Sequence, residues 1–187
     1  MKLDITQKLK DEHQLILRML ALLEKNALLT KQGSCNDYRF YLDGVDFVRN
    51  YADRFHHAKE EDVLFEALIG NGMPRLNSPV AAMLMEHDQG RAFVLGLEQA
   101  ATRALNGEAG QEKAIVAQAR GYLQLLREHI SKEDDILYPL AERVIPEELR
   151  GAIAEGYQRT EEKGVEGLEE HYRGIVEGYE KKAASLS

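Results

Sequence analysis

Apolar residues recur every three or four positions along most of this chain, which is the spacing that places them on one face of an α-helix. In residues 4–30, for example, Leu9, Ile16, Leu20 and Leu23 form one such stripe. The same periodicity predicts three more long helices, at about residues 37–69, 79–105 and 111–143. No segment shows the alternating apolar and polar pattern of a β-strand.

Turn-forming residues separate these segments. Residues 70–72 read Gly-Asn-Gly and should end the second helix, and Asn106-Gly107 should end the third. Ser78 followed by Pro79 is the order expected at a helix start. Long helices joined by short turns favour an all-α fold, an antiparallel up-down-up-down four-helix bundle, over residues 1–145.

The last part of the chain, residues 146–187, has a different composition. It begins with Pro146 before two glutamates, and it is polar and dotted with glycine. We expect one or two short helices here, packed on or beside the bundle as a C-terminal extension. His171 lies in this tail without a partner motif, and we expect an ordinary exposed histidine.

Charge and cysteine content narrow the function classes. The net charge of −8 over 187 residues argues against nucleic acid and anionic membranes as partners, because both require a basic face. Cys35 is the single cysteine, so no internal disulfide is possible, and we assign its predicted loop no chemistry. The N-terminus lacks the apolar core of a signal peptide, and no apolar run approaches membrane length. These features predict a cytoplasmic protein.

An internal repeat carries the candidate chemistry. Residues 56–65 match residues 129–138 without a gap, with a histidine, a lysine, two acids and an apolar-aromatic ending at equal offsets. The first copy falls on the second predicted helix and the other on the fourth. His56 with Glu60, and His129 with Glu133, are four residues apart and therefore share a helix face. The adjacent pair of His57 and Glu61 has the same spacing.

The first and third helices each add a histidine, His13 and His87, on an apolar stripe. A lone histidine there is usually a core residue, but four helices that each supply one indicate a shared site. Several buried imidazoles and two buried carboxylates would be costly without a compensating cation. Nitrogen and oxygen ligands without thiolate suit iron, manganese or zinc.

The order His … His-x-x-x-Glu … His … His-x-x-x-Glu, with its Lys-Glu-Glu/Asp-x-x-Leu-Phe/Tyr continuation, resembles the bacterial hemerythrin-like (HHE cation-binding) proteins over about residues 5–145. The resemblance implies a di-iron centre bridged by two carboxylates, in which manganese or zinc can replace iron. The ligands that it implies are His13, His57 or His56, Glu61 or Glu60, His87, His129, and Glu133 or Asp134. The repeat favours His56 with Glu60, and the i, i+4 spacing favours Glu133 over Asp134.

One departure from the family concerns the third helix. Many members read His-x-x-x-His there, but this chain has Arg91 at the second position, and arginine cannot bind a metal. One iron therefore loses an imidazole unless His56 and His57 both contribute. Neighbouring positions of an α-helix point about 100° apart, so a double contribution requires a distorted turn. Arg91 is expected next to the metal ligands, where its guanidinium would form a two-point hydrogen bond with a carboxylate ligand or with a metal-bound oxygen species. The alternative is a surface or interhelical salt bridge.

These residues predict a protein that binds, senses or detoxifies O2, NO or peroxide, with a small diatomic or peroxide as its ligand. Whether it is an enzyme is left open by the sequence. One alternative is iron delivery or iron–sulfur cluster repair. Another is a non-catalytic signalling module, in which the state of the iron changes the position of the tail for a protein partner.

Overall fold

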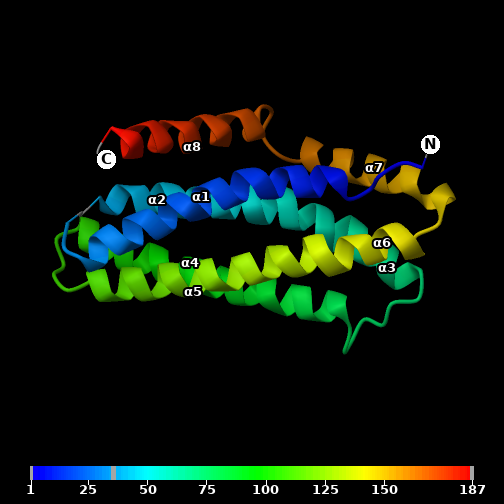
Figure 1. The fold of residues 1–187 in the computed structure, drawn as a ribbon, viewed down its shortest axis with the longest axis horizontal. Helices are drawn as coiled ribbons and strands as arrows, with labels where there is room; N and C mark the ends of the chain where they lie inside the picture. The colour runs from blue at the N-terminus through cyan, green and yellow to red at the C-terminus, as the bar shows by residue number, and fades with distance from the viewer. Residues whose placement is uncertain (1, 35–36, 186–187) are drawn as a thin grey trace.

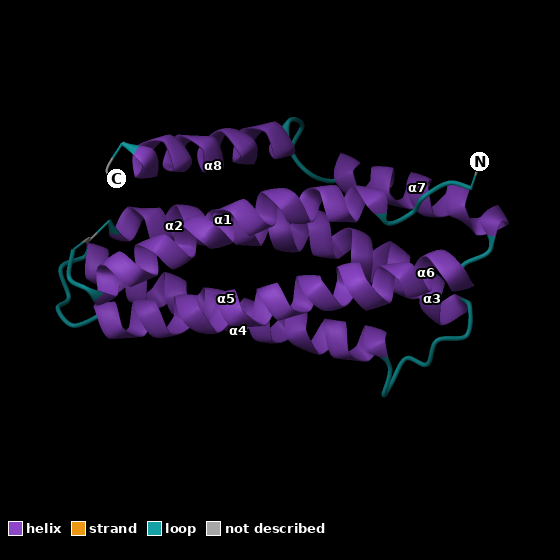
Figure 2. Ribbon diagram, in the orientation of Figure 1, coloured by secondary structure: helices purple, strands orange, loops and turns teal. Residues whose placement is uncertain are grey.

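The computed structural model describes residues 2–34 and 37–185, and it consists of helices and their connections, with no strand in these ranges. Cys35 and its predicted loop lie outside the described residues. The chain forms four long helical rods and two tail helices (Figure 1, Figure 2). In chain order the elements are α1 (Gln7–Lys31), α2 (Tyr38–Phe47), η1 (Val48–His57), η2 (Glu60–Leu64), α3 (Phe65–Gly70), α4 (Pro79–Leu105), α5 (Glu112–Lys132), η3 (Glu133–Leu137), α6 (Tyr138–Val144), α7 (Glu147–Glu162) and α8 (Leu168–Ala184).

The four predicted helices and the antiparallel bundle are confirmed. The first rod is α1, the second runs from α2 to α3, the third is α4, and the fourth runs from α5 to α6. α1 begins at Gln7 rather than Asp4, because the Asp4 carboxylate accepts hydrogen bonds from the backbone N–H groups of Thr6 and Gln7, both at 2.8 Å. At the start of α4 the Ser78 hydroxyl accepts from the Ala81 N–H at 3.2 Å, which is the expected cap.

Three π-helical segments, η1, η2 and η3, interrupt the second and fourth rods. η2 and η3 lie within the two copies of the sequence repeat, and η1 ends at His57, the second residue of the first copy. In a π-helix the hydrogen bonds run from i to i+5, so the turn is wider and consecutive side chains are rotated by less than in an α-helix. These rods therefore have the distorted turns that a double contribution from His56 and His57 requires.

The bundle core has two apolar sections. One section contains Leu20, Phe47 and Leu126, and the other contains Leu9, Leu64 and Leu137. Along each rod the histidines and glutamates of the repeat, or the single histidine, fall between the two sections. The polar side chains are therefore enclosed by apolar packing on both sides along the bundle axis.

The tail forms two helices on one side of the bundle (Figure 1). α7 packs against η2, where a Cβ atom at Gly156 would lie 2.8 Å from Val63, so only glycine allows this approach. The Tyr157 hydroxyl donates to the Ile5 carbonyl at 2.9 Å. α8 packs against α1 and η1. Among the described helices, none has the length and apolar character needed to cross a membrane.

Candidate metal centre

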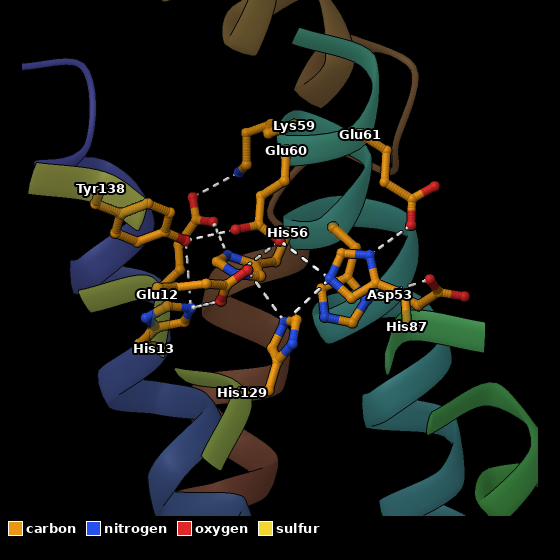
Figure 3. Close-up of polar contacts among 12 residues, drawn as sticks. Glu12, His13, Asp53, His56, Lys59, Glu60, Glu61, His87, His129 and Tyr138 are labelled. Atoms are coloured by element: carbon orange, nitrogen blue, oxygen red, sulfur yellow. Dashed lines mark hydrogen bonds and ion pairs between the residues drawn. The ribbon is translucent and has the colours of Figure 1, made fainter. Parts of the chain in front are cut away.

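Seven side chains from all four rods converge in the polar layer between the two apolar sections. Figure 3 shows His13, His56, Glu60, His87 and His129 among them. All are buried, and the most exposed of them is His57 at 7%. These seven are His13, His56, His57, Glu60, His87, His129 and Glu133. Every rod therefore contributes at least one imidazole, as the sequence predicted.

The seven side chains form two groups that can each hold one cation. His57, His87 and His129, called here the three-histidine group, join with Glu60, and their ligand atoms lie within 4.8 Å of one another. His13 and His56, the two-histidine group, join with both Glu60 and Glu133, and these ligand atoms also lie within 4.8 Å of one another. Glu60 is therefore common to the two groups.

The two glutamates span the groups. One oxygen of Glu60, Oε2, is 3.5 Å from His87 Nε2 and 3.7 Å from His56 Nε2. The Glu133 oxygens divide between the groups, with Oε1 3.1 Å from His129 Nε2 and Oε2 3.4 Å from His13 Nε2. Each carboxylate thus faces one imidazole of either group, which is the arrangement that a bridging ligand requires.

The buried carboxyl groups of this cluster favour the binding of a cation. Burial and the negative charge of Glu133 raise the pKa of Glu60 well above its usual value. Burial alone would also raise the pKa of Glu133, but His129 and His13 outweigh burial and hold the pKa of that carboxyl well below its usual range. For His13, burial lowers the pKa, but the hydrogen bond to Asp134 and the negative charge of Glu133 outweigh this effect and raise the pKa to about 9. A proton on His13 thus offsets part of the buried negative charge, a role that a metal ion would fill.

Several converging atoms lack a hydrogen-bond partner within the described part of the chain. They are Nε2 of His56, Oε2 of Glu60 and both carboxylate oxygens of Glu133, and all are buried. An unsatisfied buried polar group costs about 1–3 kcal/mol, and more when it is charged. Four such atoms at one point are the donor set of a metal site, so the residues fit a bound cation of the iron, manganese or zinc type.

Each of the five imidazoles turns its other nitrogen, Nδ1, toward an outer carboxylate. The pairs are His13 with Asp134 at 3.0 Å, His56 with Glu12 at 2.8 Å, His57 with Asp53 at 3.4 Å, His87 with Glu61 at 2.7 Å and His129 with Glu86 at 2.9 Å. A carboxylate at Nδ1 favours the tautomer that carries its proton there and leaves the Nε2 lone pair for a metal. Such outer partners are usual around metal-binding histidines.

The polar contacts have approximate two-fold symmetry. Lys59 donates to Glu12, which faces His56, and Lys132 donates to Glu86, which faces His129. The two lysines are equivalent positions of the sequence repeat. They differ in exposure, because Lys59 is completely buried and also donates to Glu161 of α7, whereas the Lys132 side chain is 39% exposed. The tail covers one half of a nearly symmetric site.

In the structure some of the predicted ligands face the centre, and others pair with the outer nitrogen of a histidine. Both His56 and His57 reach the centre, so an imidazole from η1 is present there although Arg91 provides none. Glu61 and Asp134 lie outside the two groups, because the following helix position points away from the centre toward a histidine of a neighbouring rod. Arg91 donates to Asp53 and Glu61, at 2.7 Å each, rather than to Glu60 or Glu133. It therefore supports the outer carboxylates and not the central ones.

Several neighbours of the histidines were not predicted from the sequence. Glu12 and Glu86 each directly precede a histidine, so the repeated Glu-His dipeptide was an available signal. Asp53 lies four residues before His57, the spacing of a helical pair. Tyr138, whose hydroxyl donates to Glu60 Oε1 at 2.5 Å, could not be singled out among the tyrosines. His171 is exposed in the tail, as predicted.

Comparison with known proteins agrees with this geometry. A family model described as the Hemerythrin HHE cation binding domain matches residues 4–141, which include all seven converging side chains. Among curated proteins and among solved structures, none matches the chain.

Proposed function

The chain belongs to the hemerythrin family of HHE cation-binding domains, and from this premise we propose that it holds a non-haem di-iron centre that binds, senses or detoxifies O2, NO or peroxide. The observation that carries the proposal is the pair of buried glutamates that each face both histidine groups, while Oε2 of Glu60 and both oxygens of Glu133 have no hydrogen-bond partner among the described residues. Glu60 and Glu133 would hold both ions, with His57, His87 and His129 as the further ligands of one and His13 and His56 as those of the other.

The unequal numbers of imidazoles suggest where a ligand would bind. The two-histidine group offers one nitrogen donor fewer than the three-histidine group, so a metal held there would have fewer protein ligands and could accept a small molecule. When bound, a pair of ferrous ions can supply two electrons to such a molecule. Tyr138 keeps a proton on its hydroxyl close to this group, 2.5 Å from Glu60 Oε1 and 3.5 Å from His13 Nε2. That hydroxyl can orient a ligand by hydrogen bonding.

The apolar residues around the centre would limit the access of water and protons to it. The apolar sections on both sides of the polar layer keep bulk water away from the centre. A dry site strengthens the electrostatic interactions within it and limits proton entry, which favours reversible binding over turnover. These features support binding or sensing more than rapid catalysis.

A second candidate function, signalling through the tail, has one specific observation in its favour. Glu161 of α7 accepts from Lys59 at 2.7 Å, Lys59 donates to Glu12 at 2.5 Å, and Glu12 faces His56 at 2.8 Å. A change at His56 would thus reach the tail through three polar contacts. If the tail responds, hydrogen exchange in residues 147–162 should differ between metal-loaded and chelated protein, and equal exchange would count against signalling.

Metal content and the optical spectrum test the main proposal. We expect about two irons per chain, with oxo-bridge absorption that changes on adding azide, peroxide or NO. Glu60→Ala and Glu133→Ala should lose most of the iron, because two cations would then face each other without a bridge. Asp135→Ala, at an exposed position next to the repeat's acids, is the matched control and should retain it. Full iron in both bridge variants would overturn the assignment.

A further inference from the structure

A cavity of about 250 Å³ lies beside the three-histidine group, between η1, α4 and α5. Its inner end is formed by His57, His87 and His129, whereas no residue of the two-histidine group lines it. Most of the wall is apolar and is contributed by Val48, Val94, Leu95, Leu125 and Leu126. The cavity thus approaches the centre from the end opposite to Tyr138.

The charged side chains on the cavity wall already have partners. Arg49 forms a two-point ion pair with Glu98, and Arg91 donates to Asp53, Glu61 and Asp88. A charged ligand would therefore have to compete with these pairs. A neutral ligand needs no such exchange and gains from the apolar wall.

One polar atom of the wall is unsatisfied. Tyr122 is only 3% exposed, and its hydroxyl has no hydrogen-bond partner within the described ranges of the chain. Leaving a buried hydroxyl unpaired is unfavourable. A single polar atom on a bound molecule would satisfy it.

The size of the cavity depends on a glycine. A Cβ atom at Gly90 would lie 3.6 Å from the Tyr122 ring and 3.8 Å from Leu125, which are ordinary contact distances. The helix would therefore accept a side chain here, but that side chain would occupy the cavity. An apolar cavity of about 150 Å³ can hold benzene, so the volume beside Gly90 exceeds the needs of a diatomic molecule.

We propose that this cavity is a binding site for one neutral, largely apolar organic molecule with a single hydrogen-bonding group, of the size of a phenol. Its polar atom pairs with the Tyr122 hydroxyl, and its apolar body fills the space beside Gly90. The bound molecule would lie against the three-histidine group, so any effect that it has on the centre rests on the proposed function. The binding of the molecule to the cavity does not rest on that function.

Binding of phenol and benzene to the purified full-length chain, measured by calorimetry, tests the site. We expect one molecule of either per chain. In Tyr122→Phe the ratio of phenol affinity to benzene affinity should fall at least fivefold, because the phenol hydroxyl loses its partner. In Gly90→Leu both affinities should fall more than tenfold. Gly174→Leu, at an exposed helix position with open space around it, is the control and should bind both normally.

Absence of binding to the unaltered protein would overturn the proposal, as would unchanged binding in Gly90→Leu. An unchanged affinity ratio in Tyr122→Phe would overturn the role of the hydroxyl. Failure here is distinguishable from failure of the proposed function. A chain with two irons but no bound phenol contradicts the cavity site alone, and one that binds phenol without a metal centre contradicts the proposed function alone.

Discussion

At the scale of single residues, adjacent carboxylates have different roles. Glu60 and Glu133 face the centre and are completely buried. Glu61 and Asp134, one position later, face the Nδ1 atoms of His87 and His13 on neighbouring rods. The inner acids are placed to bind cations, and the outer acids fix the tautomer and orientation of the imidazoles.

This division predicts the effect of changing an outer acid. Glu61→Gln should lower the affinity for one metal by about 10- to 100-fold, because the His87 imidazole loses its charged partner. The number of metals bound at saturation should not change. Competition with a chelator measures this affinity.

Asp62→Asn is the matched control, since Asp62 is the adjacent acid and is exposed. It should bind metal as the unaltered chain does. Equal affinities of the Glu61 and Asp62 variants would show that the outer carboxylate contributes nothing to metal binding.

At the scale of elements, the tail makes the two halves of the site unequal. Lys59 is buried between Glu12 of α1 and Glu161 of α7, and its ammonium lies 3.4 Å from the centre of the Phe55 ring. Its equivalent, Lys132, has no such cover and is paired only with Glu86 among the described residues. Docking of α7 therefore depends on a buried charge network on one side of the bundle.

Replacing the two lysines in turn tests this difference. Lys59→Met should lower the free energy of unfolding by about 3–5 kcal/mol, because Glu12 and Glu161 would lose their buried cation. Lys132→Met, the matched change at the exposed position, should cost about 1 kcal/mol or less. Urea denaturation measures both, and equal losses would contradict the structural role of the tail.

At the scale of the whole molecule, the polar layer divides the core and is itself a source of instability without a cation. Unsatisfied oxygens of Glu60 and Glu133 lie between two apolar sections. A ligand that binds only the folded state raises its stability by mass action. Metal binding and bundle stability should therefore be coupled.

Removal of metal should consequently lower the melting temperature. Free metal at 100 times its dissociation constant stabilises the fold by about 2.7 kcal/mol. For a chain of this length that corresponds to about 5–10 °C, measured by thermal unfolding with and without a chelator. In Glu133→Gln the metal-dependent difference should shrink, because one bridging carboxylate becomes neutral. The same melting temperature in both conditions would contradict the coupling.

Local sequence patterns were enough to predict the helices and several residues of the candidate site. The apolar periodicity located the four helices, since each must bury one face, and the i, i+4 spacing identified the His56–Glu60 and His129–Glu133 pairs. The family followed from the same motifs. These features are short-range consequences of helical geometry, so the chain order alone specifies them.

Only the tertiary structure decided the rest. His56 and His57 both reach the centre because packing selects a π-helical turn, which the sequence spacing does not reveal. The outer partners, such as Glu12 for His56 and Asp134 for His13, come from other rods across long stretches of chain. The cavity at Gly90 and the cover over Lys59 likewise depend on how close neighbouring helices approach. Such distances follow from packing of the whole bundle rather than from any one segment.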